Sequence, residues 1–500
     1  MGAALEHFDV LIVGAGLSGV GAACHLGMRC PEKTYAILEG RGAIGGTWDL
    51  FRYPGVRSDS DMFTLGYRFK PWIEGNNLAK GPKIRSYVAE AAREHRVTDK
   101  IRFNHWVSDV SWSSAEARWT VTAQHEGRPR RFTCAFLWMC AGYYRYAEGY
   151  TPEWKGVERF RGRVVHPQKW PEDLDYKGKR VIVIGSGATA VTIVPEMAKD
   201  AGHVVMLQRS PSYLFTLPGE NPIAKFFGAF LPRSVVYRVV RAWSVPFQTW
   251  FYQRARGKPE KMKEFLLTKL REQLPPGYDV TTHFTPRYMP WDERLCFVDD
   301  GDLFKAITAG RASVATDEID AFTERGVKLK SGREIEADIV VSATGLVLEA
   351  LGGARAVIDG RPLEIGKTLT YKGFMYDGAP NLVSVFGYLN ASWTLRADLI
   401  SEYVCRLLKF MDKNGYAATT PVNENPAVQQ QPFSDFSSGY IKRGAAATPK
   451  QGPAPWRHPQ NFYTDFFSMK FGRLDDGVLR FSERTAAPAA AKNPQLAAAE

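Results

Sequence analysis

Residues 8–19 read Phe8-Asp9-Val10-Leu11-Ile12-Val13-Gly14-Ala15-Gly16-Leu17-Ser18-Gly19, and this stretch decides the fold. A continuous apolar run that meets glycines at once is typical of a buried parallel strand turning into a helix. Residues 20–26 have helical character, and a second apolar run follows at residues 35–38. These segments predict a βαβ unit, the opening of a dinucleotide-binding fold.

The same pattern returns at residues 180–207, with an apolar run, glycines at 185 and 187, a helical stretch and a second apolar run. Two more apolar strands, 137–142 and 339–345, each end in a small residue and a glycine on either side of this second unit. The simplest topology is an α/β protein with two doubly wound Rossmann-like dinucleotide-binding domains, the second inserted into the first.

Residues 215–291 have a different, aromatic and basic composition, with apolar positions at helical spacing between 235 and 243. The spacing predicts an α-helical insertion. We expect it to pack on the second sheet as a cap, and contact with anionic lipid is the alternative interpretation.

Composition narrows the class of protein. The chain has 500 residues, 45% of them hydrophobic and 24% charged, as in globular proteins. The net charge of +12 suits nucleic acid, an anionic membrane or anionic cofactors. No block of Arg and Lys and no nucleic-acid motif occurs, so we expect no nucleic-acid partner. No run of about 18 apolar residues is present, so we expect no membrane span.

Cysteine usage points to a reducing compartment. The six cysteines are scattered and show no metal-ligand spacing. We expect reduced core thiols, no metal site and a cytoplasmic protein, with peripheral contact at the membrane left open. The first ten residues run directly into a strand and leave no room for a signal peptide.

The first glycine loop matches the G-x-G-x-x-G fingerprint between strand and helix. Gly14 permits the tight turn, Gly16 lets a pyrophosphate approach the backbone, and Gly19 packs helix on strand. Glu39 ends the second strand, 25 residues after Gly14, where a carboxylate can accept both ribose hydroxyls.

Gly45-Gly46-Thr47-Trp48 favours FAD over NAD at this first loop, because two glycines and a hydroxyl suit a loop beside the extended chain of a flavin. Trp48 stands in a region where disulfide reductases carry a Cys-x4-Cys pair, so dithiol chemistry is unsupported. A strand over residues 101–107 would offer backbone groups of Val107 to the adenine. The predicted FAD-binding residues are Gly14, Gly16, Ser18, Gly19, Glu39, Gly46, Thr47, Trp48, Asp59 and Val107.

The second glycine loop is G-x-G-x-x-A, and its second strand ends without a carboxylate. Arg209 and Ser210 stand there instead and can bind a 2′-phosphate that an acid would repel, which favours NADPH over NADH. The predicted residues at this loop are Gly185, Ser186, Gly187, Ala188, Thr189, Ala190, Arg209 and Ser210.

Residues 160–171 fit the pattern F-x-G-x-x-x-H-x-x-x-W-P at every fixed position, just before the second βαβ unit. With this stretch the chain resembles the type I Baeyer–Villiger monooxygenases over residues 5–482. Residues 45–61, 288–304 and 390–395 carry the resemblance further. The fixed positions are Phe160, Gly162, His166, Trp170 and Pro171.

The resemblance implies that NADPH reduces FAD, that reduced flavin traps O2 as a C4a-peroxide, and that this peroxide attacks a carbonyl to give an ester or lactone. It assigns Arg294 as the fixed positive charge beside the oxygen intermediate, since an arginine stays protonated. It assigns Asp59 as the acid that orients Arg294, and places Arg57 and Ser58 beside the bound nicotinamide nucleotide. Family members often carry Lys before this arginine, whereas this chain has Glu293, which leaves more of the phosphate recognition to Arg209.

The resemblance leaves two roles less defined. His166 and Trp170 lie on a connection between domains, which favours a hinge or orienting role over direct proton transfer. Trp393 is expected to open a helix aimed at the flavin, with Asn390 or Ser392 as N-cap, and packing alone would also explain it.

The leading hypothesis is an FAD- and NADPH-dependent Baeyer–Villiger monooxygenase acting on apolar ketones, with sulfoxidation of thioethers and thioamides. Oxygenation of sulfur and nitrogen alone, or an NADPH-dependent flavin reductase, are the alternatives. The physiological substrate and the oligomeric state stay open. The expected domains are FAD-binding at 1–150 and 345–484, NADPH-binding at 151–213 and 292–344, a helical insertion at 214–291 and a disordered tail at 485–500.

Overall fold

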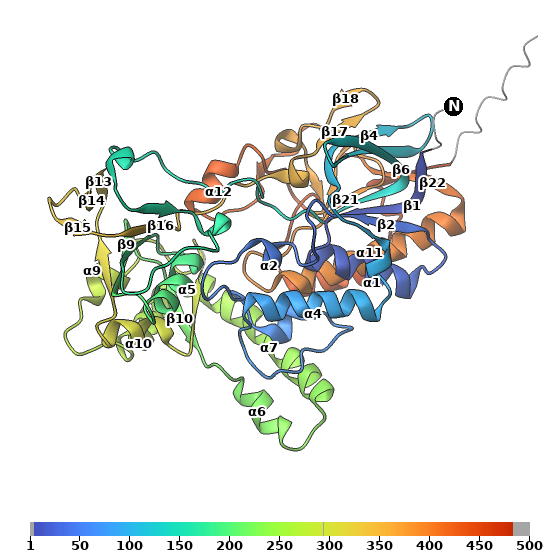
Figure 1. Ribbon diagram of the computed structural model, residues 1–500. Coiled ribbons are helices and arrows are strands. Elements are labelled where there is room, and N and C mark those ends of the chain that lie inside the picture. Colours follow the sequence, from blue (N-terminus) through green and yellow to red (C-terminus); the bar gives the residue numbers. More distant parts are fainter. Residues whose placement is uncertain (1–4, 294, 484–500) are drawn as a thin grey trace, which may run out of the picture.

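Two separate sheets organise the chain in this computed structural model, which describes residues 5–293 and 295–483 (Figure 1). The predicted tail at 485–500 lies outside the described residues. The mixed α/β architecture that the two glycine loops predicted is confirmed.

The first sheet has nine strands, and its centre is a parallel set built around the N-terminal strand. The longest strand, Arg128–Met139, pairs antiparallel with the strand Arg118–His125 on one side. On its other side it pairs parallel with the N-terminal strand Glu6–Val13. In spatial order the strands are β18 (Arg361–Pro362), β17 (Arg355–Ile358), β4 (Trp106–Ser113), β5 (Arg118–His125), β6 (Arg128–Met139), β1 (Glu6–Val13), β2 (Tyr35–Leu38) and β3 (Ile101–Arg102), with β21 (Leu382–Ser384) beside β6.

The single strand predicted over residues 101–107 is wrong, because β3 and β4 are separate strands. Between them Asn104 takes a positive φ of 57°. The backbone N–H groups of Asn104 and His105 donate to the carbonyls of Arg41 and Glu39. These hydrogen bonds hold residues 104 and 105 beside the end of β2, so the chain leaves the direction of β3 before β4 begins.

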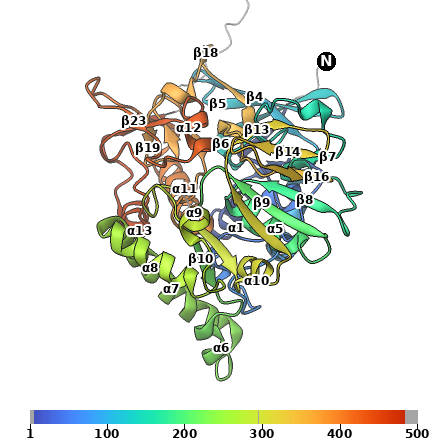
Figure 2. The same cartoon turned by 90° about the vertical axis from the view of Figure 1, so that its left-hand side faces the viewer.

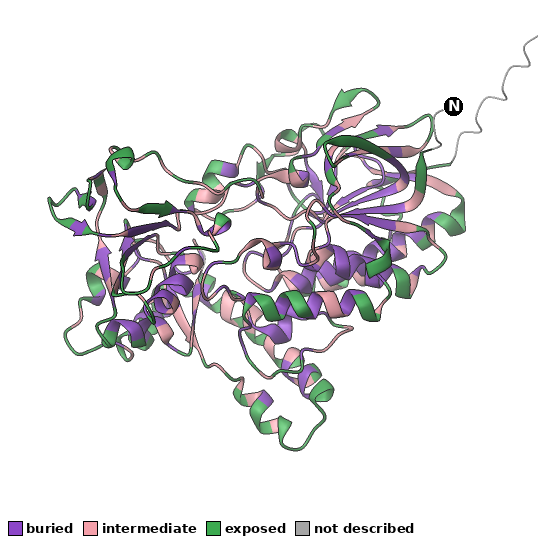
Figure 3. Cartoon of the chain, viewed as in Figure 1, coloured by how far each residue is buried: buried purple, intermediate pink, exposed green. Residues whose placement is uncertain are grey.

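Three helices cover one face of this sheet and bury its largest core, as the purple strands and helices of Figure 3 show. Their apolar faces follow the helical period, so burial of those faces stabilises them. They are α1 (Leu17–Arg29), α4 (Gly81–Glu94) and α11 (Trp393–Asn414).

The second sheet consists of five parallel strands, and a small antiparallel sheet lies next to it in sequence. Two helices, α5 (Ala188–Met197) and α10 (Asp302–Thr308), contribute buried residues to its core. The strands are, in spatial order, β12 (Ala312–Thr316), β9 (His203–Gln208), β8 (Arg180–Ile184), β16 (Ile339–Ser342) and β7 (Arg163–Val165), and the small sheet is β13 (Ile319–Phe322), β14 (Gly326–Leu329) and β15 (Glu334–Glu336).

The segment from β10 to β11 is mostly helical, and these two terminal strands pair parallel with each other. Its α6–α7 part projects downward in Figure 1. Its elements are β10 (Leu214–Leu217), α6 (Pro222–Gly228), α7 (Arg233–Gly257), α8 (Pro259–Arg271), α9 (Val280–Phe284) and β11 (Cys296–Asp299).

The expectation that this insertion packs on the second sheet is wrong for α7. The Tyr237 hydroxyl donates to the Tyr67 carbonyl at 3.0 Å, and Arg241 donates to the carbonyls of Phe63 and Gly66. Val236 and Val240 belong to the core of the first sheet. The helix thus crosses over to the N-terminal part, while α8 keeps Leu267 and Leu270 in the core of the second sheet.

The C-terminal part returns to the first sheet with β21 and α11 and also contains short helices and separate two-stranded sheets. These are α12 (Gly439–Gly444), α13 (Phe462–Phe471), β19 (Thr370–Tyr371), β20 (Met375–Tyr376), β22 (Tyr416–Pro421), β23 (Gln431–Pro432), β24 (Lys450–Gln451) and β25 (Leu479–Glu483). Among the described residues, no helix combines the length and apolar character needed to cross a membrane.

Leu407 of α11 is fully buried in the first core. Leu407→Ala should lower the free energy of unfolding by about 2–5 kcal/mol, because it removes buried methyl groups and leaves a cavity. The midpoint of urea unfolding, followed by tryptophan fluorescence, measures the effect. Lys409→Ala, on the exposed side of the same helix, is the control, and equal midpoints for the two variants would contradict this packing.

Candidate active site

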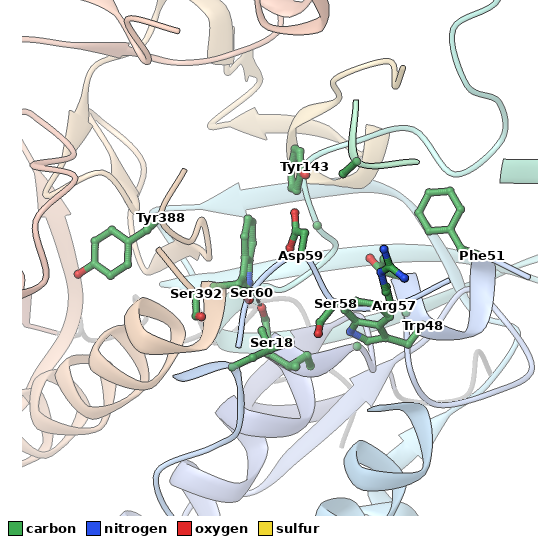
Figure 4. Close-up of a pocket in the computed structure, with 18 of the residues that line it drawn as sticks. Ser18, Trp48, Phe51, Arg57, Ser58, Asp59, Ser60, Tyr143, Tyr388 and Ser392 are labelled. Atoms are coloured by element: carbon green, nitrogen blue, oxygen red, sulfur yellow. Dashed lines mark hydrogen bonds between the residues drawn. The ribbon is translucent and has the colours of Figure 1, made fainter. Parts of the chain in front are cut away.

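A continuous cavity of about 660 Å³ extends from the first glycine loop, past Ala188 and Thr189 at the start of α5, to the helical insertion. Gly185, Ser186, Gly187, Arg209 and Ser210 of the second predicted site do not line it. This volume is in the range of sites that enclose a cofactor or small ligand. Figure 4 shows side chains from the N-terminal loop, the 48–60 segment and the start of α11 around it. Of the predicted residues, the cavity lining includes Gly14, Gly16, Ser18, Glu39, Gly46, Thr47, Trp48, Arg57, Ser58, Asp59, Val107, Ala188 and Thr189.

The turns at the two loops require glycine. Gly14 has a φ of 101°, and a Cβ there would lie 2.7 Å from the Cys140 carbonyl oxygen. Gly185 has a φ of 140°, and its Cβ would lie 2.5 Å from the Ala343 carbonyl oxygen. At each sheet the loop therefore presses against the end of a neighbouring strand, and any side chain would force the two apart. Gly19 likewise packs α1 directly on the Gly14 carbonyl.

The helices that follow both loops begin with free backbone N–H groups. Neither α1 nor α5 has a side-chain cap at its N-cap glycine or an acid in its first turn. Unsatisfied N–H groups at a helix N-terminus bind phosphate well, and the helix dipole adds to the attraction. Both loops thus fit the pyrophosphate of a dinucleotide.

Glu39 is buried at the end of β2 and holds the first loop. Its Oε2 accepts a hydrogen bond from the backbone N–H of Ala15 at 2.6 Å, and its Oε1 accepts one from that of Arg41 at 2.8 Å. Burial raises the pKa of Glu39, and these two hydrogen bonds oppose the rise. A carboxylate accepts about four hydrogen bonds, so capacity remains for ribose hydroxyls.

The segment after Gly45 builds the wall of the cavity. The Thr47 and Tyr144 hydroxyls are 2.7 Å apart and share a hydrogen bond. Trp48 packs against the cores of both sheets, so the residue that replaces a redox cysteine joins the two halves of the molecule.

Trp393 lies in an aromatic group whose other members, Tyr143 and Phe386, were not predicted; Tyr143 and Trp393 line the cavity. The Tyr143 and Trp393 rings stack with centroids 5.3 Å apart, and Phe386 contacts Trp393 at the same separation. The Trp393 indole N–H donates to the Ser18 hydroxyl at 2.7 Å. Trp393 does open α11, with Ser392 at the N-cap position, but the Ser392 hydroxyl bonds to Thr64 instead of capping the helix. The tyrosine-rich run directly after the strand at 137–142 was a signal that could have identified Tyr143.

Arg57 and Ser58 make contacts within the protein. The Arg57 guanidinium forms an ion pair with Asp302 of α10, with nitrogen–oxygen distances of 2.5 and 3.3 Å. Ser58 is buried, and its hydroxyl accepts a hydrogen bond from the backbone N–H of Ala79. Asp59 lines the cavity. Arg294 lies outside the described residues, and its neighbour Leu295 lines the cavity.

At the second loop, the Ser186 hydroxyl donates to the Ser210 carbonyl at 2.9 Å, which ties the loop to the end of β9. Arg209 follows β9 and is exposed. A second cation, Arg443, lies with its guanidinium 3.6 Å from the centre of the Tyr150 ring and against Gly345. Burial lowers the pKa of Arg443, and the positive charge of Arg209 lowers it further. Nothing in the local sequence around Arg443 pointed to this position.

The fingerprint at 160–171 lies on the connection into the second sheet. Phe160 is buried in a core beside β16, and Gly162 approaches the Asp338 carbonyl. The His166 ring packs on Gly149, its Nδ1 accepts from the Gln168 N–H at 3.1 Å, and burial lowers its pKa. Trp170 packs on the core of the second sheet, and the Pro171 carbonyl accepts from Leu174.

The fold and the site define a flavoprotein oxidoreductase with two glycine loops of the dinucleotide-binding type. A profile of flavin-binding monooxygenase-like proteins matches residues 70–258, and one of NAD(P)-binding Rossmann-like domains matches residues 12–70. The chain is 50% identical to the FAD-containing monooxygenase EthA of Mycolicibacterium smegmatis, over 98% of this chain and 100% of that one. It is 51% identical to the putative FAD-containing monooxygenase MymA of Mycobacterium tuberculosis, over 95% and 98% of the two chains. The chain belongs to the flavin-binding monooxygenase family, and its cofactors are FAD and NADPH.

Solved structures share the fold. A steroid monooxygenase bound to NADP superposes with a TM-score of 0.77 at 21% identity, covering 95% of this chain and 100% of that one. Cyclohexanone monooxygenase superposes with a TM-score of 0.74 at 17% identity, covering 96% and 100%. The arrangement of two nucleotide-binding sheets is thus that of Baeyer–Villiger monooxygenases.

Glu39→Ala should weaken FAD binding about tenfold to a hundredfold, because charge-assisted hydrogen bonds to the loop and the ribose are lost. The dissociation constant of FAD, measured by fluorescence titration of the apoprotein, reports the change. Glu32→Ala removes an exposed carboxylate nearby in sequence and serves as the control. Equal FAD affinity in the two variants would exclude Glu39 from the site.

Proposed function

We propose that this enzyme oxidises apolar ketones to esters or lactones with O2 and NADPH, and oxygenates thioethers and thioamides as well. The observation that carries the proposal is the continuity of the cavity. It begins at the first glycine loop, passes Asp59 and Leu295, and continues between apolar side chains of the insertion. The apolar lining comes from Phe215, Leu217, Ile223, Trp243, Phe247, Phe251, Trp291 and Phe297.

When bound, NADPH would provide the hydride and FAD the oxygen-activating chemistry of the reaction. The task of this chain is to hold the substrate carbonyl near the flavin, to exclude bulk water and to stabilise negative charge on oxygen. Trp393, Tyr143 and Trp48 supply a rigid apolar wall around the place where the flavin ring would lie. Arg294 is proposed as the fixed positive charge, oriented by Asp59, with no proton lost at any step.

Two other chemistries compete with this proposal. Oxygenation of sulfur or nitrogen alone would need no arginine near the reacting oxygen, and the relatives EthA and MymA are named only as FAD-containing monooxygenases. A flavin reductase for thiols would need a redox pair in the cavity. In the described part of the chain Cys140 is the one cysteine lining it, and burial raises the pKa of that thiol. This argues against thiol exchange.

For the 2′-phosphate of NADPH, we propose that Arg443 acts with Arg209. The two cations repel each other in the protein alone, and an anion between them would relieve that repulsion. Burial raises the pKa of Glu293, and the charges of Lys442 and Arg209 oppose the rise, so this carboxylate lies in the field of the same cationic group. Arg443 would thereby compensate for the family lysine that Glu293 replaces.

We also propose the division into an FAD-binding domain at 1–150 and 345–484, an NADPH-binding domain at 151–213 and 292–344, and an insertion at 214–291. A cytoplasmic location is proposed as well. The location is supported by the cysteines, all six of which are buried and free of disulfides.

Arg294→Ala should reduce ketone oxygenation at least about a hundredfold, because the charge that stabilises the reacting oxygen is lost. Anaerobic reduction of FAD by NADPH should persist in the same variant. Product formation by gas chromatography and stopped-flow absorbance measure the two steps. Arg287→Ala, an exposed arginine seven positions earlier, is the control. Unchanged ketone turnover in Arg294→Ala would favour the chemistry restricted to heteroatoms.

Arg209→Ala and Arg443→Ala should each raise KM for NADPH about tenfold or more while leaving KM for NADH nearly unchanged, because only NADPH carries the 2′-phosphate. Initial rates of anaerobic FAD reduction at varied cofactor concentration provide the measurement. A parallel loss with both cofactors in Arg443→Ala would show that this arginine acts on structure and not on the phosphate.

A further inference from the structure

The outer face of α6 and α7 carries large apolar side chains in contact with solvent. Phe226 is 64% exposed and Phe230 76% on the α6 arm, and Trp243 is 60% and Trp250 57% exposed on α7. The rings of Phe226 and Phe230 contact each other, as do those of Phe247 and Trp250. Single exposed apolar residues are ordinary, but two pairs of exposed aromatic rings on consecutive helices indicate a binding surface. We call these residues, with Phe247, the aromatic face.

The charged side chains of the same segment are all basic. Residues 221–259 contain seven Lys and Arg and no Asp or Glu. Arg241 and Arg256 pair with acids elsewhere in the fold. Within residues 5–293 and 295–483, Arg233, Arg238, Arg254 and Lys258 form no salt bridge. A helix with aromatic residues and unneutralised basic residues matches the chemistry of an anionic bilayer surface.

The aromatic face is also the mouth of the active-site cavity. Trp243 and Phe247 line the cavity and are exposed at the same time. Pro222 and Ile223 of α6 line it as well. Figure 2 shows α6, α7, α8 and α13 along one edge of the molecule, so this edge can meet a flat surface without obstruction from either sheet. Helix α13 carries further exposed aromatic residues, namely Tyr463, Phe467 and Phe471.

We propose that the α6–α7 face docks on an anionic lipid bilayer, with its aromatic side chains in the interface and its arginines at the lipid phosphates. The cavity mouth then faces the bilayer, and an apolar substrate dissolved in lipid reaches it without crossing water. Trp and Phe side chains gain most at such a boundary because their rings leave water while the basic groups stay hydrated. The docking does not depend on which substrate the enzyme oxidises.

Sedimentation of the FAD-loaded full chain with vesicles tests the proposal. The enzyme should bind vesicles of phosphatidylcholine mixed with phosphatidylglycerol, bind phosphatidylcholine alone more weakly, and lose binding as salt rises. Arg233→Glu/Arg238→Glu should reduce binding about tenfold or more, and Phe226→Ser/Phe230→Ser should reduce it severalfold. FAD content and NADPH oxidation report that these variants are folded.

Lys177→Glu/Arg333→Glu is the matched control, since it makes the same change in charge at exposed positions around the second sheet. Binding of this control should equal that of the wild type. Failure of the wild type to bind anionic vesicles would overturn the proposal, as would an equal loss in the control. A change from oligomer to monomer in the Phe226→Ser/Phe230→Ser variant without any change in vesicle binding would assign the face to a second copy of the chain, and would also overturn it.

Discussion

Residues 143–150 and 343–349 run past each other between the two sheets, and their pairing fixes the active site. The backbone N–H of Arg145 donates to the Val347 carbonyl at 2.8 Å, and that of Glu349 donates to the Tyr143 carbonyl at 3.0 Å. The Arg145 guanidinium also pairs with the Glu349 carboxylate at 2.9 Å. Because each crossing begins where a parallel strand ends, this pairing brings the carboxyl ends of both sheets to one place. Ligands of open α/β sheets bind at those ends, so the pairing brings the two predicted nucleotide sites toward each other.

Other contacts keep this arrangement aligned. Trp48 joins the two cores, the Arg57–Asp302 ion pair connects the loop after it to α10, and His166 packs on the first crossing through Gly149. Interfaces between domains of one chain often permit relative movement of the domains. The same contacts that align the two sites thus also offer a hinge, consistent with the orienting role proposed for His166.

Much of the fold could be predicted because it rests on local rules. A buried strand, a glycine turn and a helix can be recognised from residues that are close together in the sequence. Once these are recognised, the end of the second strand of each unit can be located, at Glu39 in the first and just before Arg209 in the second. The break between β3 and β4 could not be predicted, because backbone hydrogen bonds to the distant Glu39–Arg41 segment cause it. The docking of α7 on the first sheet depends on Tyr237 and Arg241 meeting carbonyl groups some 170 residues away. Tyr143 and Arg443 take their places through the same long-range pairing of the two crossings.

We propose that the enzyme brings both nucleotides and a ketone together, so that one oxygen atom of O2 enters the substrate. Turnover of an apolar ketone under ¹⁸O2 with NADPH tests this directly by mass spectrometry of the product. The account predicts an ester or lactone carrying one ¹⁸O atom for each NADPH oxidised, with the second atom released as water. Oxidation of NADPH that yields only labelled hydrogen peroxide, with the ketone and a thioether both recovered unchanged, would contradict it.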